Sequence, residues 1–433
     1  MREIVKQKIV DGQAMPVPDF TRRDVHIPAV KNKAIAIVGM RRTGKTTLLW
    51  QILSDRVSKG ANRNGIMYFG FEDERLAGMT VSDLDLIVSE FYLLHPEYRD
   101  RRRATFLFDE IQVVPGWATF ARRLLDSEQV DLFLTGSSAR LLSREVATNM
   151  RGRAMEALIY PFSFREYLRH TGQESKTNPD RMPKGERSRL ESSLASYLKD
   201  GGFPEAQGLD PRDRFELLKG YVDLVLLRDV IERHAVSHPV ALRWMACQLL
   251  ANAAGGFSVN KFHNDLKSQG IGVAKDTLHA YLGYLEDAFL FRTVSLSTGS
   301  ERRRMVNPRK AYPIDPALIP VFERTGRANL GHTLETVILL ELDRRGLETG
   351  YVLTPNGLEV DFLARNHDGK QELIQVCVDM GDPVVLKRET TALQEAGKLY
   401  PHAARTIITM APEKISPIPH GIIVRSAADW LLK

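Results

Sequence analysis

The residues with the clearest chemistry form the segment Gly39-Met40-Arg41-Arg42-Thr43-Gly44-Lys45-Thr46, directly after the apolar run 34–38. This is the spacing of a phosphate-binding loop, whose backbone N–H groups surround phosphate oxygens at a helix N-terminus. We expect Lys45 to reach the β- and γ-phosphates and the Thr46 hydroxyl to hold Mg²⁺. The alternative is a glycine-rich turn that binds no ligand. The predicted nucleotide contacts are Gly39, Arg42, Thr43, Gly44, Lys45, Thr46 and Thr47.

A second chemical motif is the acid pair Asp109-Glu110, which ends the apolar run 106–108. In a nucleotide-binding sheet, an Asp at the carboxyl end of a buried strand steadies Mg²⁺, and the next Glu orients or deprotonates the attacking water. We therefore expect hydrolysis as well as binding, with Asp109 at the metal and Glu110 as a catalytic residue. The alternative is an acidic strand end that faces water.

Two further sets of polar residues follow along the chain. Thr135 and Ser137 close an apolar run and are candidates for placing the water near the γ-phosphate; either equally suits a helix N-cap. Arg151 and Arg153 are candidates for an arginine finger, which stabilises transition-state charge in the same chain or in a neighbouring subunit. Surface arginines without a catalytic role are the alternative.

Apolar runs predict the elements that position these residues. Short runs separated by helix-length stretches indicate an α/β fold with a parallel sheet buried on both faces. One run, 66–71, lies between the loop and the acid pair, an order that suits the additional-strand class of P-loop ATPases. The runs are 34–38, 66–71, 105–108 and 132–135.

The motifs form a series that resembles the archaeal and bacterial AAA-type ATPases with a C-terminal domain of unknown function. The series is GMRRTGKTTLL, YFGFEDERL, FLFDEIQ, LTGSSARLL, MRGRA and YPFSFREYL. The resemblance implies ATP as the nucleotide and an additional-strand core, with a sensor near Ser137 and finger arginines within 151–153. It also includes the acidic pair Glu72-Asp73, for which capping of the next helix is the plain interpretation.

Downstream of the core, residues 257–282 follow the order helix, glycine-bearing turn, helix, and are similar to a winged helix. Leu278, Leu282 and Leu285 form one apolar stripe, and polar residues at the start of the second helix are what major-groove contact requires. A module that contacts protein and a solvated charged loop are the alternatives. The predicted DNA contacts are Lys275, Thr277, His279, Arg302, Arg303 and Arg304, with Arg309 and Lys310 as further basic residues.

The last region resembles a restriction-endonuclease-like core, in which carboxylates hold a metal ion beside a lysine. Glu335, Asp361 and Gln375 match that pattern, but Cys377 stands at the position of the lysine. Without the ammonium, a charge that stabilises the developing oxyanion is missing. We therefore expect a degenerate nuclease site and a domain retained for binding.

Length and composition limit the classes of protein to which these motifs can belong. The 433 residues leave room for about three domains, and the net charge of +6 permits a nucleic-acid partner without requiring one. Two cysteines are too few for a disulfide framework, and neither a signal peptide nor a run of about 18 apolar residues is present. We expect a cytoplasmic protein without membrane association. The predicted regions are an N-terminal extension 1–30, the ATPase core 31–170, a linker and helical lid 171–237, a winged-helix domain 238–298 and an endonuclease-like domain 299–433.

Together these features predict Mg²⁺-dependent ATP hydrolysis coupled to conformational change, in a homo-oligomer that binds or remodels DNA, including branched DNA. Two other functions stay open. One is an ATP-dependent regulatory switch that binds a protein partner and never contacts DNA. The other is an ATP-gated, metal-dependent nuclease.

Overall fold

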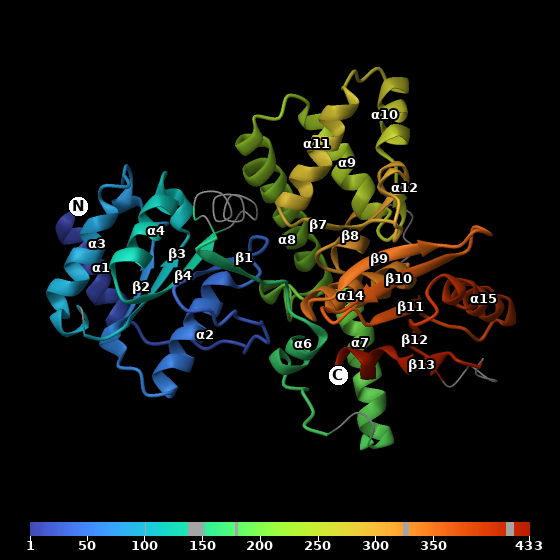
Figure 1. The fold of residues 1–433 in the computed structure, drawn as a ribbon, viewed down its shortest axis with the longest axis horizontal. Coiled ribbons are helices and arrows are strands. Elements are labelled where there is room, and N and C mark those ends of the chain that lie inside the picture. The colour runs from blue at the N-terminus through green and yellow to red at the C-terminus, as the bar shows by residue number, and fades with distance from the viewer. Residues whose placement is uncertain (100, 137–149, 151, 178–180, 324–328, 413–419) are drawn as a thin grey trace. The chain divides into compact units, whose positions relative to one another are not determined.

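The computed structural model describes residues 1–433 except 100, 137–149, 151, 178–180, 324–328 and 413–419 (Figure 1). The chain divides into two compact units. The first is Met1–Tyr160 with Asp287–Phe289, and the second is Pro161–Glu286 with Leu290–Lys433. Within the described ranges, no helix combines the length and the apolar character needed to cross a membrane.

A five-stranded parallel sheet organises the first unit in the order β2-β3-β4-β1-β5. Every residue of β1 and β3 is buried, which explains their continuous apolar runs, since helices cover a parallel sheet on both faces. Strand β4 lies between β1 and β3, as the additional-strand prediction requires. The strands are β1 (Ala34–Val38), β2 (Ile66–Gly70), β3 (Ala104–Asp109), β4 (Val130–Gly136) and β5 (Ala154–Leu158).

Helices pack on the two faces of this sheet according to the alternation of side chains along each strand. Phe106 and Phe108 pack on one face with residues of α1, α3 and α4, while Leu107 packs on the other face with α2. The helices are α1 (Arg2–Ala14), α2 (Lys45–Ser58), α3 (Leu84–Leu94) and α4 (Trp117–Ser127), with short 3₁₀ segments η1 (Arg63–Gly65), η2 (Glu74–Leu76), η3 (Pro96–Tyr98) and η4 (Ile111–Val113).

The second unit begins with helices and contains two sheets (Figure 1). Its helical segments are α6 (Phe164–His170), α7 (Lys184–Asp200), η6 (Pro204–Ala206), α8 (Pro211–Leu224), the π-helical η7 (Val225–Glu232), α9 (Pro239–Ala251), α10 (Val259–Ser268), α11 (Lys275–Asp287), α12 (Glu301–Val306), α13 (Leu318–Phe322), α14 (Leu330–Arg344), α15 (Pro383–Leu399) and α16 (Ala427–Leu431).

The smaller sheet is antiparallel and has the order β6-β8-β7. Its strands are β6 (Gly256–Phe257), β7 (Phe291–Val294) and β8 (Arg309–Pro313). Along the chain the order is α9, β6, α10, α11, β7, α12, β8. The predicted boundary between 298 and 299 therefore falls between two paired strands of one sheet.

The larger sheet is mixed and has the order β13-β12-β11-β10-β9. Strands β9 to β11 pair antiparallel, and β11 to β13 pair parallel. Phe362 and Ile374 pack on one face with α14, and Leu363 and Leu373 pack on the other with α15. The strands are β9 (Glu348–Leu353), β10 (Glu359–Arg365), β11 (Gln371–Cys377), β12 (Ala404–Thr409) and β13 (Ile423–Ser426).

A buried carboxyl group holds the turn between α7 and η6. Asp315 is 1% exposed and accepts hydrogen bonds from the backbone N–H groups of Gly202 (2.7 Å) and Ala317 (2.9 Å). A Cβ on Gly201 would lie 2.0 Å from Asp315 Oδ1, so this turn requires glycine. Burial raises the pKa of Asp315 from 3.8 to about 6, against the opposing effect of the two N–H donors.

This raised pKa predicts a loss of stability with rising pH. Between the unfolded and folded pKa values the native state binds more protons, so the free energy of unfolding falls by about 2 kcal/mol from pH 4 to pH 7, at about 1.4 kcal/mol per pKa unit. Asp315→Asn, measured by urea unfolding across this range, flattens that slope. The exposed Asp368→Asn keeps it, and an unchanged slope in Asp315→Asn contradicts the assignment.

Candidate functional site

The phosphate-binding loop follows the carboxyl end of β1, as predicted. Gly39 leaves the strand with φ 158° against the chain at Ile159, where a Cβ would lie 2.3 Å from the carbonyl oxygen. Gly44 has φ 93° and precedes α2, whose N-terminus bears Lys45, Thr46 and Thr47. Both positions therefore require glycine. The backbone N–H groups of this helix start are suited to bind an anion.

The lysine and threonines of the loop have different environments. Lys45 is 6% exposed, and its Nζ donates to the carbonyl oxygens of Met40 (3.0 Å) and Gly39 (3.2 Å). Thr43 is fully buried and its hydroxyl donates to the Met40 carbonyl at 2.9 Å. Thr46 is exposed at its surface. Lys45 and Thr43 thus form hydrogen bonds within the loop, whereas Thr46, which is predicted to hold Mg²⁺, stays exposed.

Asp109 joins the loop to the sheet. Its Oδ2 accepts hydrogen bonds from the Thr46 hydroxyl and from the Tyr68 hydroxyl, each at 2.9 Å. Its Oδ1 accepts from the Thr135 hydroxyl at 2.5 Å. The carboxylate is 6% exposed, so these donors replace the water that it loses on folding. The two motifs predicted to hold Mg²⁺ therefore lie in direct contact.

Glu110 adopts an unusual backbone conformation for a residue with a side chain. It lies in the left-handed region, with φ 57° and ψ 41°, and its N–H donates to Thr135 Oγ1 at 2.9 Å. Its side chain contacts Gln112. Such strain costs on the order of 1–3 kcal/mol and persists where the surroundings impose it. Thr135 thus positions both acidic residues, a role different from the predicted sensor or N-cap.

The acidic pair Glu72-Asp73 divides between two roles. Asp73 accepts from the backbone N–H of Arg75 at the start of η2, and its Oδ2 lies 2.6 Å from Lys8 Nζ. Hydrogen bonds from the side chains of Arg75 and Lys8 hold the pKa of Asp73 well below its usual value. Burial raises the pKa of Glu72, and the Glu110 carboxylate raises it further. Glu72 therefore belongs to the electrostatic environment of the acid pair, while capping accounts for Asp73.

Arg23 is a residue of this site that the sequence patterns miss. It is 4% exposed, and its guanidinium donates to the carbonyl oxygens of Thr43 (2.8 Å) and Tyr160 (2.6 Å). Gln51 on α2 accepts from the Arg23 backbone N–H at 2.7 Å. The predicted N-terminal extension therefore supplies a side chain that supports the phosphate-binding loop. The sequence patterns also miss Tyr68, since it is one of several aromatic residues in an apolar strand.

The predicted sensor and finger residues have different outcomes. Ser137 and Arg151 lie outside the described residues. Arg153 is described, and it forms an ion pair with Asp126. Its carbonyl accepts from the N–H of Ala34 at 2.9 Å, at the end of β1 opposite to the loop. At 3.3 Å per residue, roughly 16 Å of strand β1 separates this hydrogen bond from the phosphate-binding loop. This position does not fit a finger in the same chain.

Two family models match separate parts of the chain. A family model described as an AAA domain matches residues 31–168, and one described as a domain of unknown function matches residues 191–327. The uncharacterized protein MJ1544 of Methanocaldococcus jannaschii is 33% identical over 380 residues, which cover 87% of this chain and 81% of that protein. The chain belongs to the AAA-type ATPases with a C-terminal domain of unknown function.

Two other proteins similar to this AAA-type ATPase extend the comparison. An uncharacterized protein of Haemophilus influenzae is 31% identical over 399 residues, which cover 92% of this chain and 94% of that protein. The solved structure of the Walker-type ATPase PABY2304 of Pyrococcus abyssi aligns with a TM-score of 0.41 and 16% identity, over 74% of this chain and 95% of that one. Similarity at the level of this structure bears on neither activity nor partners.

The residues predicted to contact DNA lie on two helices of the second unit. On α11, Lys275 and His279 are exposed and Thr277 is half-buried, whereas Leu278, Leu282 and Leu285 are buried as expected. Arg302, Arg303 and Arg304 lie on α12, a short helix without a buried residue. The run of arginines is thus helical and solvated. The list of basic residues needs one correction, because Lys310 is only 5% exposed.

Lys310 instead lies within the region predicted as a degenerate nuclease site. Its Nζ is 3.0 Å from Glu335 Oε1, 2.7 Å from Glu359 Oε1 and 3.6 Å from Asp361 Oδ1. Although burial opposes it, these carboxylates raise the pKa of Lys310. Burial and Glu335 raise the pKa of Asp361 well above its usual value. The structure thus places an ammonium among the predicted metal-binding carboxylates, from β8 and not from position 377.

Gln375 faces a different partner. Its Nε2 donates to Glu389 Oε2 at 2.7 Å, and Glu389 also pairs with Arg388. Glu335, Asp361 and Gln375 all line one cavity of about 670 Å³. Among the described residues, no group of three or more His, Cys, Asp or Glu side chains has the arrangement to hold a metal ion. The three predicted residues therefore share a cavity. Asp361 Oδ2 accepts from the backbone N–H of Val376 at 2.9 Å, and Gln375 Oε1 is buried without a hydrogen-bond partner among the described residues.

Removal of the Arg23 guanidinium is expected to weaken the loop. Arg23→Ala leaves two buried carbonyl oxygens without their donor, which costs about 1–3 kcal/mol, and we expect weaker ATP binding by calorimetry together with a lower melting temperature. Arg22→Ala is the matched control, because Arg22 is 56% exposed and pairs with Asp55 at the surface. Equal effects of the two variants contradict the role of Arg23.

Removal of the Lys310 ammonium is expected to destabilise the second unit. Lys310→Met leaves the buried carboxylates of Glu335 and Asp361 uncompensated, at a cost of about 3–5 kcal/mol. Adding Glu335→Gln restores part of this loss, since one carboxylate is then neutral. Urea unfolding of the full chain measures both variants, and lower pH recovers stability in Lys310→Met. A midpoint that does not change in Lys310→Met refutes the assignment of a buried ion cluster.

Proposed function

We propose that this AAA-type ATPase hydrolyses ATP with Mg²⁺ and couples hydrolysis to a conformational change used on DNA. The observation that carries the proposal is the contact between the two motifs. Thr46 of the phosphate-binding loop donates to Asp109, and Thr135 holds both Asp109 and the backbone of Glu110. The groups required for triphosphate binding and for water activation thus lie at one edge of the sheet.

The chemistry follows from these positions. The loop N–H groups and Lys45 bind the phosphates and stabilise the charge that develops on them. The oxygen donors Thr46 and Asp109 suit Mg²⁺, which binds to few protein oxygens together with substrate phosphates and supplies positive charge at the reacting phosphate. Glu110 orients the attacking water and accepts its proton. Tyr68 and Thr135 keep Asp109 in place.

Coupling to DNA rests on the second unit. The order of helices and strands around the β6-β8-β7 sheet supports the winged-helix interpretation, with exposed Lys275 and His279 at the start of α11. Basic residues there are suited to phosphates and base edges. Arg153, remote from its own loop, serves as a finger only toward a neighbouring subunit, which is why we propose a homo-oligomer.

A regulatory switch that binds a protein partner is the second candidate. One observation favours it: Met305 and Val306 on α12 are 84% and 72% exposed. Exposed apolar side chains beside arginines are suited to a protein surface as well as to DNA. This switch shares the ATPase site and differs in what the second unit contacts.

The experiment that tests both candidates measures ATP turnover with and without forked, four-way and linear DNA. Lys45→Ala and Glu110→Gln are expected to lower turnover at least 100-fold, since one removes phosphate binding and the other removes water activation. Glu110→Gln retains ATP binding by calorimetry, whereas Lys45→Ala weakens it. Undiminished turnover in Glu110→Gln contradicts the mechanism. DNA that neither binds nor alters turnover favours the switch.

A further inference from the structure

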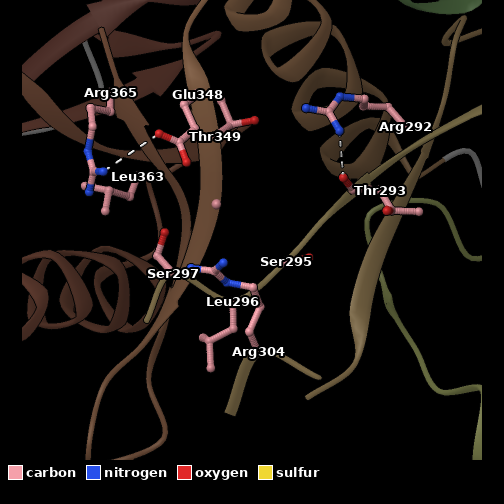
Figure 2. A pocket seen from close by; sticks show the side chains of 11 residues that line it. Arg292, Thr293, Ser295, Leu296, Ser297, Arg304, Glu348, Thr349, Leu363 and Arg365 are labelled. Carbon is pink, nitrogen blue, oxygen red and sulfur yellow. Dashed lines mark hydrogen bonds and ion pairs between the residues drawn. The ribbon is translucent and has the colours of Figure 1, made fainter. Parts of the chain in front are cut away.

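A polar cavity of about 240 Å³ lies in the second unit, beside α12 (Figure 2). Three arginines line it: Arg292 from β7, Arg304 from α12 and Arg365 from the end of β10. In Figure 2 Arg292 and Arg365 stand on opposite sides, and Arg304 reaches toward Ser297 between them. The cavity is larger than one water molecule needs, at about 30 Å³.

The cavity forms where the chain beyond β7 joins the edge of the larger sheet. The N–H of Ser297 donates to the Tyr351 carbonyl at 2.8 Å, and the N–H of Tyr351 donates to the Ser295 carbonyl at 3.1 Å. Gly350 permits this close approach, because a Cβ there would lie 2.3 Å from Ser297 Oγ. The wall therefore has a fixed backbone and is not a loose surface depression.

Each arginine is held by a neighbour and is still partly exposed. Arg292 Nε lies 2.8 Å from Asp343 Oδ2, and Arg304 Nη1 lies 2.8 Å from Glu301 Oε1. Arg365 and Glu348 are 3.7 Å apart, beyond hydrogen-bond distance. The three side chains are 43%, 46% and 46% exposed, respectively. Arg292 and Arg304 also donate to the carbonyl oxygens of Thr293 (3.0 Å) and Thr298 (3.1 Å), and the Gln371 amide oxygen is placed to accept from Arg365. The guanidinium groups are thus positioned and keep part of their surface exposed.

Positive charge also extends beyond the cavity. Arg302 and Arg303 are exposed on α12, and within the described part of the chain neither side chain has an ion-pair partner. Arg365 and Arg303 both oppose the rise that burial causes in the pKa of Tyr400, so both act on the same region. In the wall itself, the Thr349 hydroxyl is buried without a hydrogen-bond partner among the described residues. Each arginine of the cavity has one acidic neighbour, so the excess of positive charge in this region comes from Arg302 and Arg303.

We infer that this cavity binds one phosphate group of a nucleic-acid strand, with Arg302 and Arg303 beside its neighbouring phosphates. Guanidinium groups bind phosphate oxygens in pairs, with geometry that lysine lacks. A strand fits better than a free anion because it carries one phosphate for each nucleotide, about 3.4 Å of helix axis in a duplex, and the arginines continue past the cavity. The inference rests on the DNA part of the proposed function and names its contact site.

The experiment measures binding of fluorescently labelled forked DNA to the full chain as a function of salt. Arg304→Gln and Arg365→Gln are each expected to weaken binding about tenfold, the value of one charge-assisted hydrogen bond. Each is also expected to reduce the slope of log K against log salt by about 1. Arg228→Gln is the matched control, because Arg228 is also an exposed helical arginine, 2.8 Å from Glu232. Thermal melts establish that each variant is folded.

The outcomes separate this inference from the proposed function. If the wild type binds DNA tightly and Arg304→Gln and Arg365→Gln bind it equally well, the inference about the cavity is wrong and the proposed DNA function stands. Absence of DNA binding by the wild type overturns both, while ATP hydrolysis stands or falls on its own assay. Inorganic phosphate provides the remaining arm. If the wild type binds phosphate at micromolar levels but no DNA, and Arg365→Gln loses phosphate binding, the cavity is a site for a free anion. This result overturns the inference that the cavity binds a nucleic-acid strand.

Discussion

The buried carboxylate of Asp109 is the interaction on which the nucleotide site depends. Hydroxyl groups from α2, β2 and β4 donate to its two oxygens, and each comes from a different part of the chain. A carboxylate taken out of water loses several kcal/mol of hydration, so it is stable at this position only with such donors. These same bonds fix the distance between the phosphate-binding loop and the acid pair. The order of the sheet, with β4 between β1 and β3, brings the donors around Asp109.

The second unit depends on the opposite arrangement, a buried cation among carboxylates. Lys310 on β8 compensates Glu335 on α14 and Glu359 and Asp361 on β10, so the smaller and the larger sheet share one ion cluster. Glu335 and Asp361 are buried, so removing the Lys310 charge leaves two buried carboxylates unbalanced. The cluster includes Glu335 and Asp361, two of the residues that the sequence predicts to bind a metal ion. The cation position among these carboxylates already holds an ammonium.

Local patterns predicted much of this protein because their information is contiguous. The four apolar runs are strands of the first sheet, the loop precedes a helix, and the leucine stripe of α11 is buried. The supporting residues escaped prediction, since their partners are distant in sequence. Tyr68 lies 41 positions from Asp109, Arg23 lies 20 from Thr43, and Lys310 lies 25 from Glu335. A tyrosine in an apolar strand and an arginine in an extension carry no signal of their own.

The sequence by itself determined the phosphate-binding loop, the acid pair and the alternation of strand and helix, because periodicity and motif spacing act over a few residues. Only the tertiary structure decided which side chains surround those motifs. It placed Thr135 and Tyr68 on Asp109, Arg23 behind the loop and Lys310 beside Glu335. The physical reason is that burial of a charge has to be compensated by whichever donors the packing brings near, and packing depends on contacts across the whole chain.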